Sequence, residues 1–343
     1  MSPFFPAPVL AIESSCDETS AAVVSGRQVR SNIVASQIAM HAQWGGVVPE
    51  AAARAHVESI LPVIGEALAA ADMTLSEIGG IAVTNRPGLV GALSVGVTAA
   101  KAFSFARGLP LVGVHHIEGH LSSLLAEPLD PQYPLVALVV SGGHTELAYL
   151  QSPLRYTILG ATRDDAAGEA LDKSARLMGL DYPGGRLLEE LARSGDASRY
   201  PLPRALGKET FEMSFSGLKT AVLRTFEKEG ADLDRAGLAA SAQAAVVDVL
   251  CARVARALEL YPARAVGVVG GVAANSSLRS GLERTASRYG VAFLAPDRSL
   301  CTDNAGMIGL AGSLRLAAGE RAGMDLPTLA ADSLPGLERS PDR

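Results

Sequence analysis

Residues 9–24, VLAIESSCDETSAAVV, hold two short apolar runs on either side of a polar turn. Apolar runs of about four residues beside turn-forming residues are typical of buried β-strands. We therefore predict a β-hairpin in which Val9–Ile12 and Ala21–Val24 are the strands and Glu13–Thr19 is the turn.

The same pattern occurs a second time in the middle of the chain. Leu135–Val140 is an apolar run, Ser141–Thr145 is a polar turn that contains glycine, and Glu146–Leu150 is a second run. After each hairpin comes a strand that leads through a glycine turn into a helix, Ile81–Thr84 in the first half and Ala265–Val269 in the second. A pattern repeated in this order indicates an internal duplication.

The duplication predicts an α/β fold of two similar domains whose glycine turns face each other across a nucleotide-binding cleft. We place the first domain at residues 1–134 and the second at 135–324, with an insertion within 151–264. Residues 325–343 contain Pro327, Pro335 and Pro341 and no sustained apolar periodicity, so we expect a disordered tail.

The composition is that of a globular protein. Of the 343 residues, 48% are hydrophobic and 19% are charged, which supports well-packed cores. The net charge of −6 argues against a nucleic-acid binder that acts alone, because neutralising phosphates requires a concentrated field of Lys and Arg. The cysteines are isolated, and we find no targeting segment or membrane-spanning run, so we expect a cytoplasmic protein without membrane association.

Two histidines lie one helical turn apart after an apolar strand. The i, i+4 spacing of His116 and His120 places both imidazoles on one face of a helix, within reach of one metal ion. A pair of core or surface histidines can have the same spacing, so the pair alone leaves both interpretations open. Zinc peptidases carry the pattern HExxH, but here Ile117 follows His116 and the nearby Glu118 lies on a different face.

A carboxylate far along the chain can complete this site. Asp303 lies at a predicted strand-to-helix junction. Two histidines and one carboxylate form a ligand set that suits Fe(II) and also accommodates zinc. The alternative role for Asp303 is the N-cap of the helix that follows.

Two glycine turns offer backbone N–H groups to an anion. In Ser141-Gly142-Gly143 and in Gly270-Gly271, the missing side chains let phosphate or carboxylate approach the backbone. Asn275 follows the second turn and could hydrogen-bond a ribose or a base edge. A tight hairpin and close strand–helix packing are the alternative reasons for these glycines.

A series of further motifs occurs in a fixed order along the chain. They are ESSCDET at 13–19, His41 with GGVVPE at 45–50, PGLVGAL at 87–93, HHIEGH at 115–120, VSGGHT at 140–145, DDAAGE at 164–169 with LDK at 171–173, DYPGG at 181–185, SFSGLK at 214–219, GGVAAN at 270–275 and CTDN at 301–304. From Val9 to about Leu316 the chain closely resembles the TsaD family, the tRNA adenosine threonylcarbamoyltransferases once described as O-sialoglycoprotein endopeptidases.

The resemblance implies a duplicated actin/hexokinase/Hsp70-like (ASKHA) fold and a reaction. In that reaction, the threonylcarbamoyl group of threonylcarbamoyl-AMP passes to the N6 amine of the adenosine 3′ of the anticodon, in tRNAs that read codons beginning with A, and AMP is released. The implied partners are tRNA, a TsaB-like paralogue and a TsaE-like ATPase. The implied cofactor is one divalent metal ion, with Fe²⁺ expected and Zn²⁺ as the alternative. The alternative functions are an ASKHA-fold small-molecule kinase, a metallopeptidase and a non-catalytic scaffold.

Matched motif by motif, the resemblance assigns His116, His120 and Asp303 as metal ligands. Glu13, Asp17 and His144 are candidates for proton transfer, although each could instead stabilise a turn or a neighbouring site residue. The adenylate-binding positions implied by the resemblance are Val139, Val140, Ser141, Gly142, Gly143, Asp172, Gly185 and Asn275.

Arg86 departs from the pattern of the family, which usually has glycine at this position. An arginine before Pro87 prefers extended backbone. If the glycine of the family has a positive φ, Arg86 predicts a rebuilt or strained turn.

Overall fold

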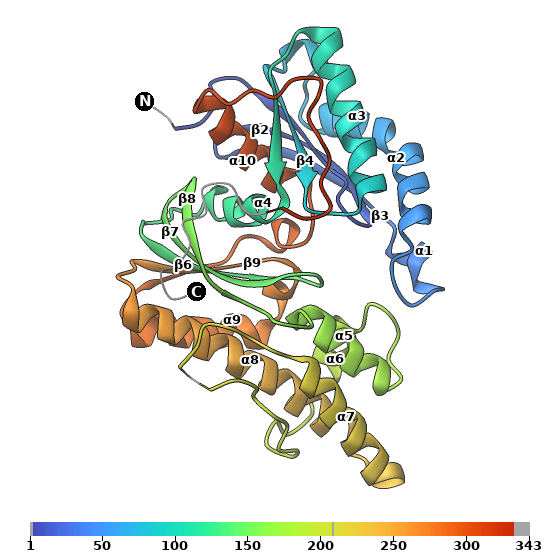
Figure 1. Cartoon of the computed structure of the whole chain (residues 1–343), viewed down its shortest axis with the longest axis vertical. Helices are drawn as coiled ribbons and strands as arrows, with labels where there is room; N and C mark the ends of the chain where they lie inside the picture. The colour runs from blue at the N-terminus through green and yellow to red at the C-terminus, as the bar shows by residue number, and fades with distance from the viewer. Residues whose placement is uncertain (1–2, 208, 333–343) are drawn as a thin grey trace. The chain divides into compact units, whose positions relative to one another are not determined.

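The computed structural model describes residues 3–207 and 209–332 (Figure 1). Their contacts divide the chain into two compact units. Among the described residues, the first unit comprises residues 3–130 and 296–332, and the second comprises residues 131–295 apart from residue 208.

These units differ from the expected domains, 1–134 and 135–324, mainly in the placement of residues 296–332. That part belongs to the first unit, because helix α10 (Ala305–Ala317) packs against the first sheet. Gly309 and Gly312 allow the close approach, since an added Cβ would collide with Val24 and Ala82 of the sheet.

The first sheet has five strands in the order β3-β2-β1-β4-β5. The predicted hairpin is confirmed, since β1 and β2 are antiparallel with Val9 opposite Val24 and Ile12 opposite Ala21. β4 runs parallel to β1, and β5 runs parallel to β4. The strands are β1 (Val9–Glu13), β2 (Glu18–Ser25), β3 (Gln28–Ser36), β4 (Gly80–Arg86) and β5 (Leu111–His115).

Alternate residues of β1 belong to two different cores, which explains why this strand has no polar face. Leu10 and Ile12 pack with apolar residues of α2 and α3, whereas Val9 and Ala11 pack with those of α10. Besides α10, the helices of the first unit are α1 (Ile38–Ala42), α2 (Pro49–Ala70), α3 (Val90–Arg107) and α4 (His116–Ser122), with short 3-10 helices η1 (Leu75–Glu77), η2 (Ser123–Leu125) and η5 (Arg298–Leu300).

The second sheet repeats the topology of the first, in the order β8-β7-β6-β9-β10. β6 and β7 form an antiparallel hairpin with Leu135 opposite Leu150, and β9 and β10 continue the sheet in parallel. The predicted duplication is therefore confirmed. The strands are β6 (Leu135–Val140), β7 (Thr145–Ser152), β8 (Arg155–Ala161), β9 (Ala265–Val269) and β10 (Ala292–Leu294).

The helices of the second unit lie largely in the predicted insertion. They are α5 (Ala167–Leu177), α6 (Gly184–Ala192), α7 (Ser216–Glu229), α8 (Arg235–Leu260) and α9 (Ser276–Arg288), with η3 (Gly230–Asp232) and η4 (Gly271–Ala274). Within the described part of the chain, only α8 has the length and hydropathy of a membrane span. Since 67% of its apolar window is buried, α8 resembles the core helix of a globular protein.

The chain after α10 lies against the carboxyl ends of β4 and β5. Asn85 Nδ2 donates to the carbonyl of Pro327 at 2.9 Å, and the N–H of Leu329 donates to the carbonyl of Asn85 at 3.0 Å. Arg86 Nε forms an ion pair with Asp332 Oδ2 at 2.9 Å. Residues 325–332 of the expected disordered tail are therefore held by specific contacts, and residues 333–343 lie outside the described residues.

The strain expected at Arg86 is absent. Arg86 is the last residue of β4 and pairs with His115 of β5 in the parallel register. Among the described residues, the non-glycine residues with positive φ are Asp72 and Leu206. Arg86 therefore needs no glycine-like backbone, and its side chain holds the C-terminal segment instead.

Candidate metal centre

Helix α4 positions the two histidines. It begins at His116 directly after β5, and Nδ1 of the N-cap residue His115 accepts a hydrogen bond from the N–H of Ile117 at 3.2 Å. His116 and His120 are 4% and 0% exposed. Both imidazoles are therefore buried on one helical face, as the spacing predicted.

The start of α10 brings Asp303 to the histidines. Asn304, not Asp303, is the N-cap of this helix, because its Oδ1 accepts a hydrogen bond from the N–H of Met307 at 3.0 Å. The N-cap alternative for Asp303 is therefore wrong. Since its neighbour caps the helix, the carboxylate of Asp303 is available to the histidines.

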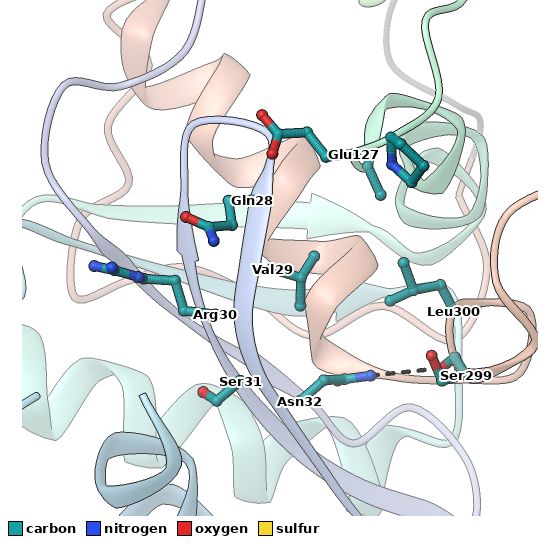
Figure 2. Close-up of a pocket in the computed structure, with 10 residues that line it drawn as sticks. Gln28, Val29, Arg30, Ser31, Asn32, Glu127, Ser299 and Leu300 are labelled. Carbon is teal, nitrogen blue, oxygen red and sulfur yellow. Dashed lines mark hydrogen bonds between the residues drawn. The ribbon is translucent and has the colours of Figure 1, made fainter. Parts of the chain in front are cut away.

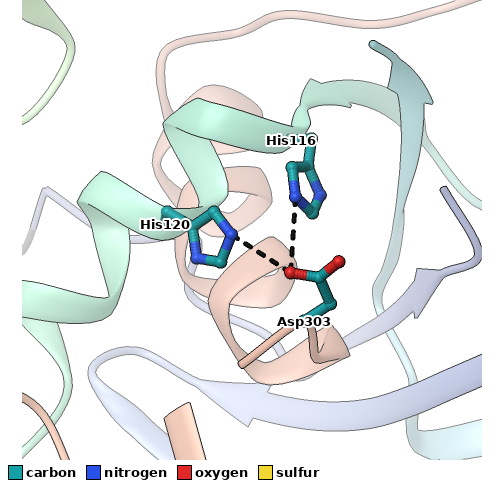
Figure 3. Close-up of side chains that lie close together, drawn as sticks. All are labelled: His116, His120 and Asp303. Atoms are coloured by element: carbon teal, nitrogen blue, oxygen red, sulfur yellow. Dashed lines mark ion pairs between the residues drawn. The ribbon is translucent and has the colours of Figure 1, made fainter. Parts of the chain in front are cut away.

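Figure 3 shows the three side chains converging on one point. Asp303 Oδ1 lies 3.2 Å from His120 Nε2 and 3.5 Å from His116 Nε2. One ligand atom from each residue can be chosen so that all lie within 4.8 Å of one another. Two Nε2 atoms and a carboxylate oxygen at this separation can bind the same cation.

Unpartnered nitrogen atoms at His120 support a cation at this position. Neither ring nitrogen of His120 has a hydrogen-bond partner within the described part of the chain, although both are buried. A buried polar atom without a partner costs free energy, and most such atoms in folded proteins are paired. A metal ion bound at Nε2, beside Asp303, would remove that cost at one of the two nitrogens. The donors therefore fit a divalent cation.

The three candidate ligands differ in their protonation. Burial alone would raise the pKa of Asp303, but the charge of His116 and the close approach of both imidazoles hold it well below its usual value. Burial alone would lower the pKa of His116, but Asp303 and Glu13 raise it well above its usual value. For His120, burial prevails and its pKa is lowered. Without a cation, His116 is therefore an imidazolium between two carboxylates, and His120 is neutral.

Glu13, at the end of β1, lies behind His116. Its Oε1 accepts the N–H of Ser15 at 2.5 Å, and its Oε2 accepts Thr84 Oγ1 at 2.5 Å and lies 3.1 Å from His116 Nδ1. The residue is 0% exposed. Burial alone would raise the pKa of Glu13. The charge of His116 and its hydrogen bond lower this pKa by more, so it lies below the usual value of a glutamate. Glu13 is therefore a buried carboxylate without surface for a substrate.

The turn of the first hairpin contains further acids. Asp17 is half-buried, and its carbonyl accepts the N–H of Gln37 at 3.0 Å. Burial and the neighbouring Asp17 raise the pKa of Glu18 to about 9, so its carboxyl group is protonated near neutral pH. Burial, with Asp17 and Asp303, also raises the pKa of the Cys16 thiol, which disfavours the thiolate that a cysteine nucleophile needs.

The expected adenylate-binding residues all lie in the second unit. Val139 and Val140 are buried in β6. In the next loop, the N–H of Ser141 donates to the carbonyl of His144 at 2.8 Å, and Ser141 Oγ accepts the N–H of His144 at 3.0 Å. A Cβ added to the two glycines at 142–143 would meet no heavy atom within 4 Å. The backbone of this loop is therefore open to a ligand.

The other three expected positions have partners of their own. Asp172 Oδ1 accepts the N–H of Gly185 at 2.7 Å, which joins α5 to the start of α6. Asn275 Oδ1 caps α9 by accepting the N–H of Leu278 at 3.0 Å, and its Nδ2 donates to Gln243 Oε1 at 2.8 Å. Because the Asn275 side chain is buried and uses both polar atoms in these contacts, a direct contact with a ligand would compete with them.

Sequence reasoning missed several residues that support these positions. Ser15 and Thr84 contact Glu13, Gln243 contacts Asn275, and Arg315 contacts Glu118 across 197 positions of the chain. Ser15 lies in the ESSCDET motif, but the contact is made by its backbone N–H, which the motif does not specify. The other three contacts join segments that are distant in the sequence, so no motif or spacing marks them.

A separate pocket of about 580 Å³ opens along the edge strand β3 in the first unit (Figure 2). Its lining includes Gln28, Arg30 and Asn32 of β3, with Glu127 and Ser299 from other segments. None of the three candidate metal ligands lines it. This pocket is therefore distinct from the candidate metal centre.

The fold places the chain in the class of actin/hexokinase-like (ASKHA) α/β proteins. HypF from T. kodakarensis matches with a TM-score of 0.60 and 16% identity, over 92% of this chain and 48% of that chain. The (R)-2-hydroxyglutaryl-CoA dehydratase component A of Acidaminococcus fermentans matches with a TM-score of 0.55 and 14% identity, over 91% of this chain and 99% of that chain. Identities this low show a shared fold and nothing more.

Within this class, the sequence defines the family. The profile of TsaD, described as tRNA N6-adenosine threonylcarbamoyltransferase, matches residues 28–310. A relative of that name from Bacillus licheniformis is 52% identical over 337 residues, which cover 96% of each chain. One from Moorella thermoacetica is 54% identical over 309 residues, which cover 88% of this chain and 90% of that one. The chain therefore belongs to the TsaD family of transferases.

Proposed function

We propose that this chain transfers the threonylcarbamoyl group of threonylcarbamoyl-AMP to the N6 amine of the adenosine 3′ of the anticodon, in tRNAs that read codons beginning with A. The observation that carries the proposal is the convergence of His116, His120 and Asp303 in a member of the TsaD family. Relatives at 50–54% identity bear the name of this activity.

The chemistry is an acyl transfer. The N6 amine forms a bond to the carbamoyl carbon, the bond from that carbon to the phosphate oxygen breaks, and AMP leaves with the electron pair. The amine loses one proton to a base or to water. Because an adenine amine is a weak nucleophile, most of the rate must come from positioning and from stabilising charge on the carbamoyl oxygen.

His116, His120 and Asp303 would hold one divalent metal ion, with Fe²⁺ as the proposed ion and Zn²⁺ as the alternative. When bound, the ion would supply a Lewis acid that polarises a substrate oxygen. The chain's own contribution is to keep three donors together in a buried position, where electrostatic interactions are stronger than in water.

In the second unit, the open loop at Gly142–Gly143 would offer backbone N–H groups to the adenylate, and Asp172 and Gly185 would flank the nucleoside. Asn275 would act mainly by fixing the start of α9. Asp17 and His144 are both half-buried, and they remain the candidates for accepting the amine proton.

The proposed partners are tRNA, a TsaB-like paralogue and a TsaE-like ATPase, in the cytoplasm and without a membrane. The net charge of −6 supports a need for helper proteins, since an acidic protein attracts tRNA poorly by itself.

A metallopeptidase is the less favoured alternative. The carboxylate that could serve as its general base, Glu118, is fully buried and paired with Arg315. An ASKHA-fold kinase is the other alternative; a glucokinase from Streptomyces griseus shares the fold, with a TM-score of 0.50 and 13% identity, which does not show a shared activity. A kinase would phosphorylate a small substrate and would not need His116 or His120.

The test is a reconstituted assay with threonylcarbamoyl-AMP, unmodified tRNA and the proposed partner proteins. Asp303→Asn keeps the shape of the side chain but removes its charge, so we expect lost metal and a rate lower by about 100-fold or more. Modified adenosine is counted by mass spectrometry, and metal content by elemental analysis.

Asp297→Asn is the matched control, because Asp297 lies near Asp303 in sequence but accepts hydrogen bonds from Ser299 at the start of η5. It should retain metal and activity. Equal modification by the wild type and Asp303→Asn would reject the metal role. If the protein phosphorylates a sugar with ATP and does not modify tRNA, the proposed transferase activity is rejected.

A further inference from the structure

Glu13 has no exposed surface, yet it contacts a candidate metal ligand. We propose that Glu13 is a positioning residue that holds the ring of His116 with Nδ1 toward its own carboxylate and Nε2 toward the metal, and that it exchanges no proton with the substrate. This inference rests on the metal centre proposed above.

The carboxylate of Glu13 faces donors on both oxygens. Oε1 accepts the N–H of Ser15, and Oε2 accepts the hydroxyl of Thr84, each at 2.5 Å. The same Oε2 lies 3.1 Å from Nδ1 of His116, and the hydroxyl oxygen of Ser15, which can accept from the same N–H, lies 3.2 Å from that nitrogen. An ionised carboxylate can only accept hydrogen bonds. If Nδ1 of His116 carries a proton, the three groups that contact the Glu13 carboxylate are all donors.

That proton determines which nitrogen can bind a metal. A neutral imidazole carries one proton, so placing it on Nδ1 leaves the lone pair on Nε2. Nε2 of His116 is the atom that faces Asp303 Oδ1, at 3.5 Å. A histidine ligand that donates its other N–H to a carboxylate has a fixed tautomer, a fixed ring orientation and higher basicity.

The second histidine lacks such a partner. Nδ1 of His120 has no hydrogen-bond partner within the described part of the chain. Its ring is held by packing in a fully buried position. The candidate site is therefore asymmetric, with His116 oriented by a hydrogen bond and His120 by its surroundings.

Glu13→Gln tests the inference, because an amide cannot satisfy all three donors. If its oxygen accepts the N–H of Ser15, its NH₂ group points at Thr84 and His116 Nδ1. That arrangement favours a proton on Nε2 of His116, which blocks metal binding there. The flipped amide places two donors against each other at Ser15. Either orientation should weaken Zn²⁺ binding, by about 10–100-fold.

Zn²⁺ is the probe, and its affinity is measured by competition with a chromophoric chelator. ¹⁵N–¹H spectra of the Zn²⁺-loaded wild type should show the proton of His116 on Nδ1 and the metal on Nε2. The ring of His120 serves as the comparison within the same spectrum. A purely structural role of Glu13 would lower stability without moving this proton.

Glu18→Gln is the matched control in the same hairpin. Glu18 accepts a hydrogen bond from Ser36 Oγ at 2.9 Å, and no hydrogen bond or ion pair to His116 is found for it in the described structure. Its Zn²⁺ affinity and its His116 spectrum should match those of the wild type.

Unchanged Zn²⁺ affinity in Glu13→Gln would overturn the inference and leave the metal centre standing. Failure of the wild type to bind Zn²⁺ would overturn both. If Glu13→Gln does not fold, the wild-type spectrum still decides, since Zn²⁺ bound through Nδ1 of His116 contradicts the inference.

Discussion

Arg315 of α10 and Glu118 of α4 form a buried ion pair that joins the helix carrying His116 and His120 to the helix that follows Asp303. Arg315 Nη2 lies 2.6 Å from Glu118 Oε2, and Arg315 Nε also pairs with Glu118 Oε1. Glu118 lies between His116 and His120 in the sequence, and Asp303 precedes Asn304, the N-cap of α10. The ion pair therefore holds the last turn of α10 against the first turn of α4.

Arg315→Met should destabilise the first unit by about 3–5 kcal/mol, because the buried Glu118 carboxylate loses its ion pair with Arg315. Urea unfolding followed by circular dichroism measures the loss. Adding Glu118→Leu to this variant should recover most of the stability, since an apolar pair of similar volume avoids the desolvation cost. Additive losses in the double variant would show that the two residues do not interact.

The stability of the metal-free protein should depend on the protonation of His116. Its pKa is raised in the folded state, so its contribution is fully present below the unfolded value of about 6.5 and is lost as the pH rises through the folded value. His120 acts in the opposite direction because its pKa is lowered.

Urea unfolding in EDTA, compared between the wild type and His116→Gln, isolates the contribution of His116. The stability difference should be largest below about pH 6.5 and shrink in alkaline solution. Asp303 contributes stability above about pH 3.9 and loses it as the pH falls further, because its pKa is depressed. A difference that grows with pH would contradict the raised pKa of His116.

Metal affinity should rise with pH in the same range. Without a cation, His116 carries a proton on Nε2 that a metal must displace, so binding releases that proton. Titration with Zn²⁺ at several pH values, with proton release measured in two buffers of different ionisation enthalpy, checks this prediction. Binding without proton release would show that His116 is already neutral.

Gly312→Ala should push α10 away from the first sheet. An added Cβ would collide with Ala82 of β4, so we expect a loss of about 1–3 kcal/mol and weaker metal binding, because Asp303 moves with the helix. Gly65→Ala in α2 is the control, since an added Cβ there meets no heavy atom within 4 Å. That change should stabilise the helix by about 0.5–1 kcal/mol. Thermal unfolding compares the two variants.

Asn85→Ala should release the C-terminal segment. It removes the donor to Pro327 and the acceptor of Arg86 Nη1, so residues 325–332 should become more sensitive to protease. Arg86→Ala should have a smaller effect, since Asp332 is 40% exposed and such ion pairs contribute about 0–1 kcal/mol. Equal cleavage rates in the wild type and Asn85→Ala would show that these contacts do not hold the segment.

The duplication and the histidine pair were readable from the sequence, because both depend on local order. Apolar runs such as Val9–Ile12 must be buried, and a helical turn brings residues four positions apart onto one face. The sequence did not reveal the domain boundary after residue 295, because it is set by the packing of α10 against strands that lie far away in the chain. The capping role of Asn304, beside Asp303, also required the backbone to be seen.

By itself, the sequence determined the hairpin repeat, the family and the spacing of His116 and His120. Only the tertiary structure decided that Asp303 faces these histidines, that Glu13 lies behind one of them and that Arg315 neutralises Glu118. The physical reason is that periodicity records which side chains avoid water, whereas a partner across 100 or more positions is set by how helices and strands pack.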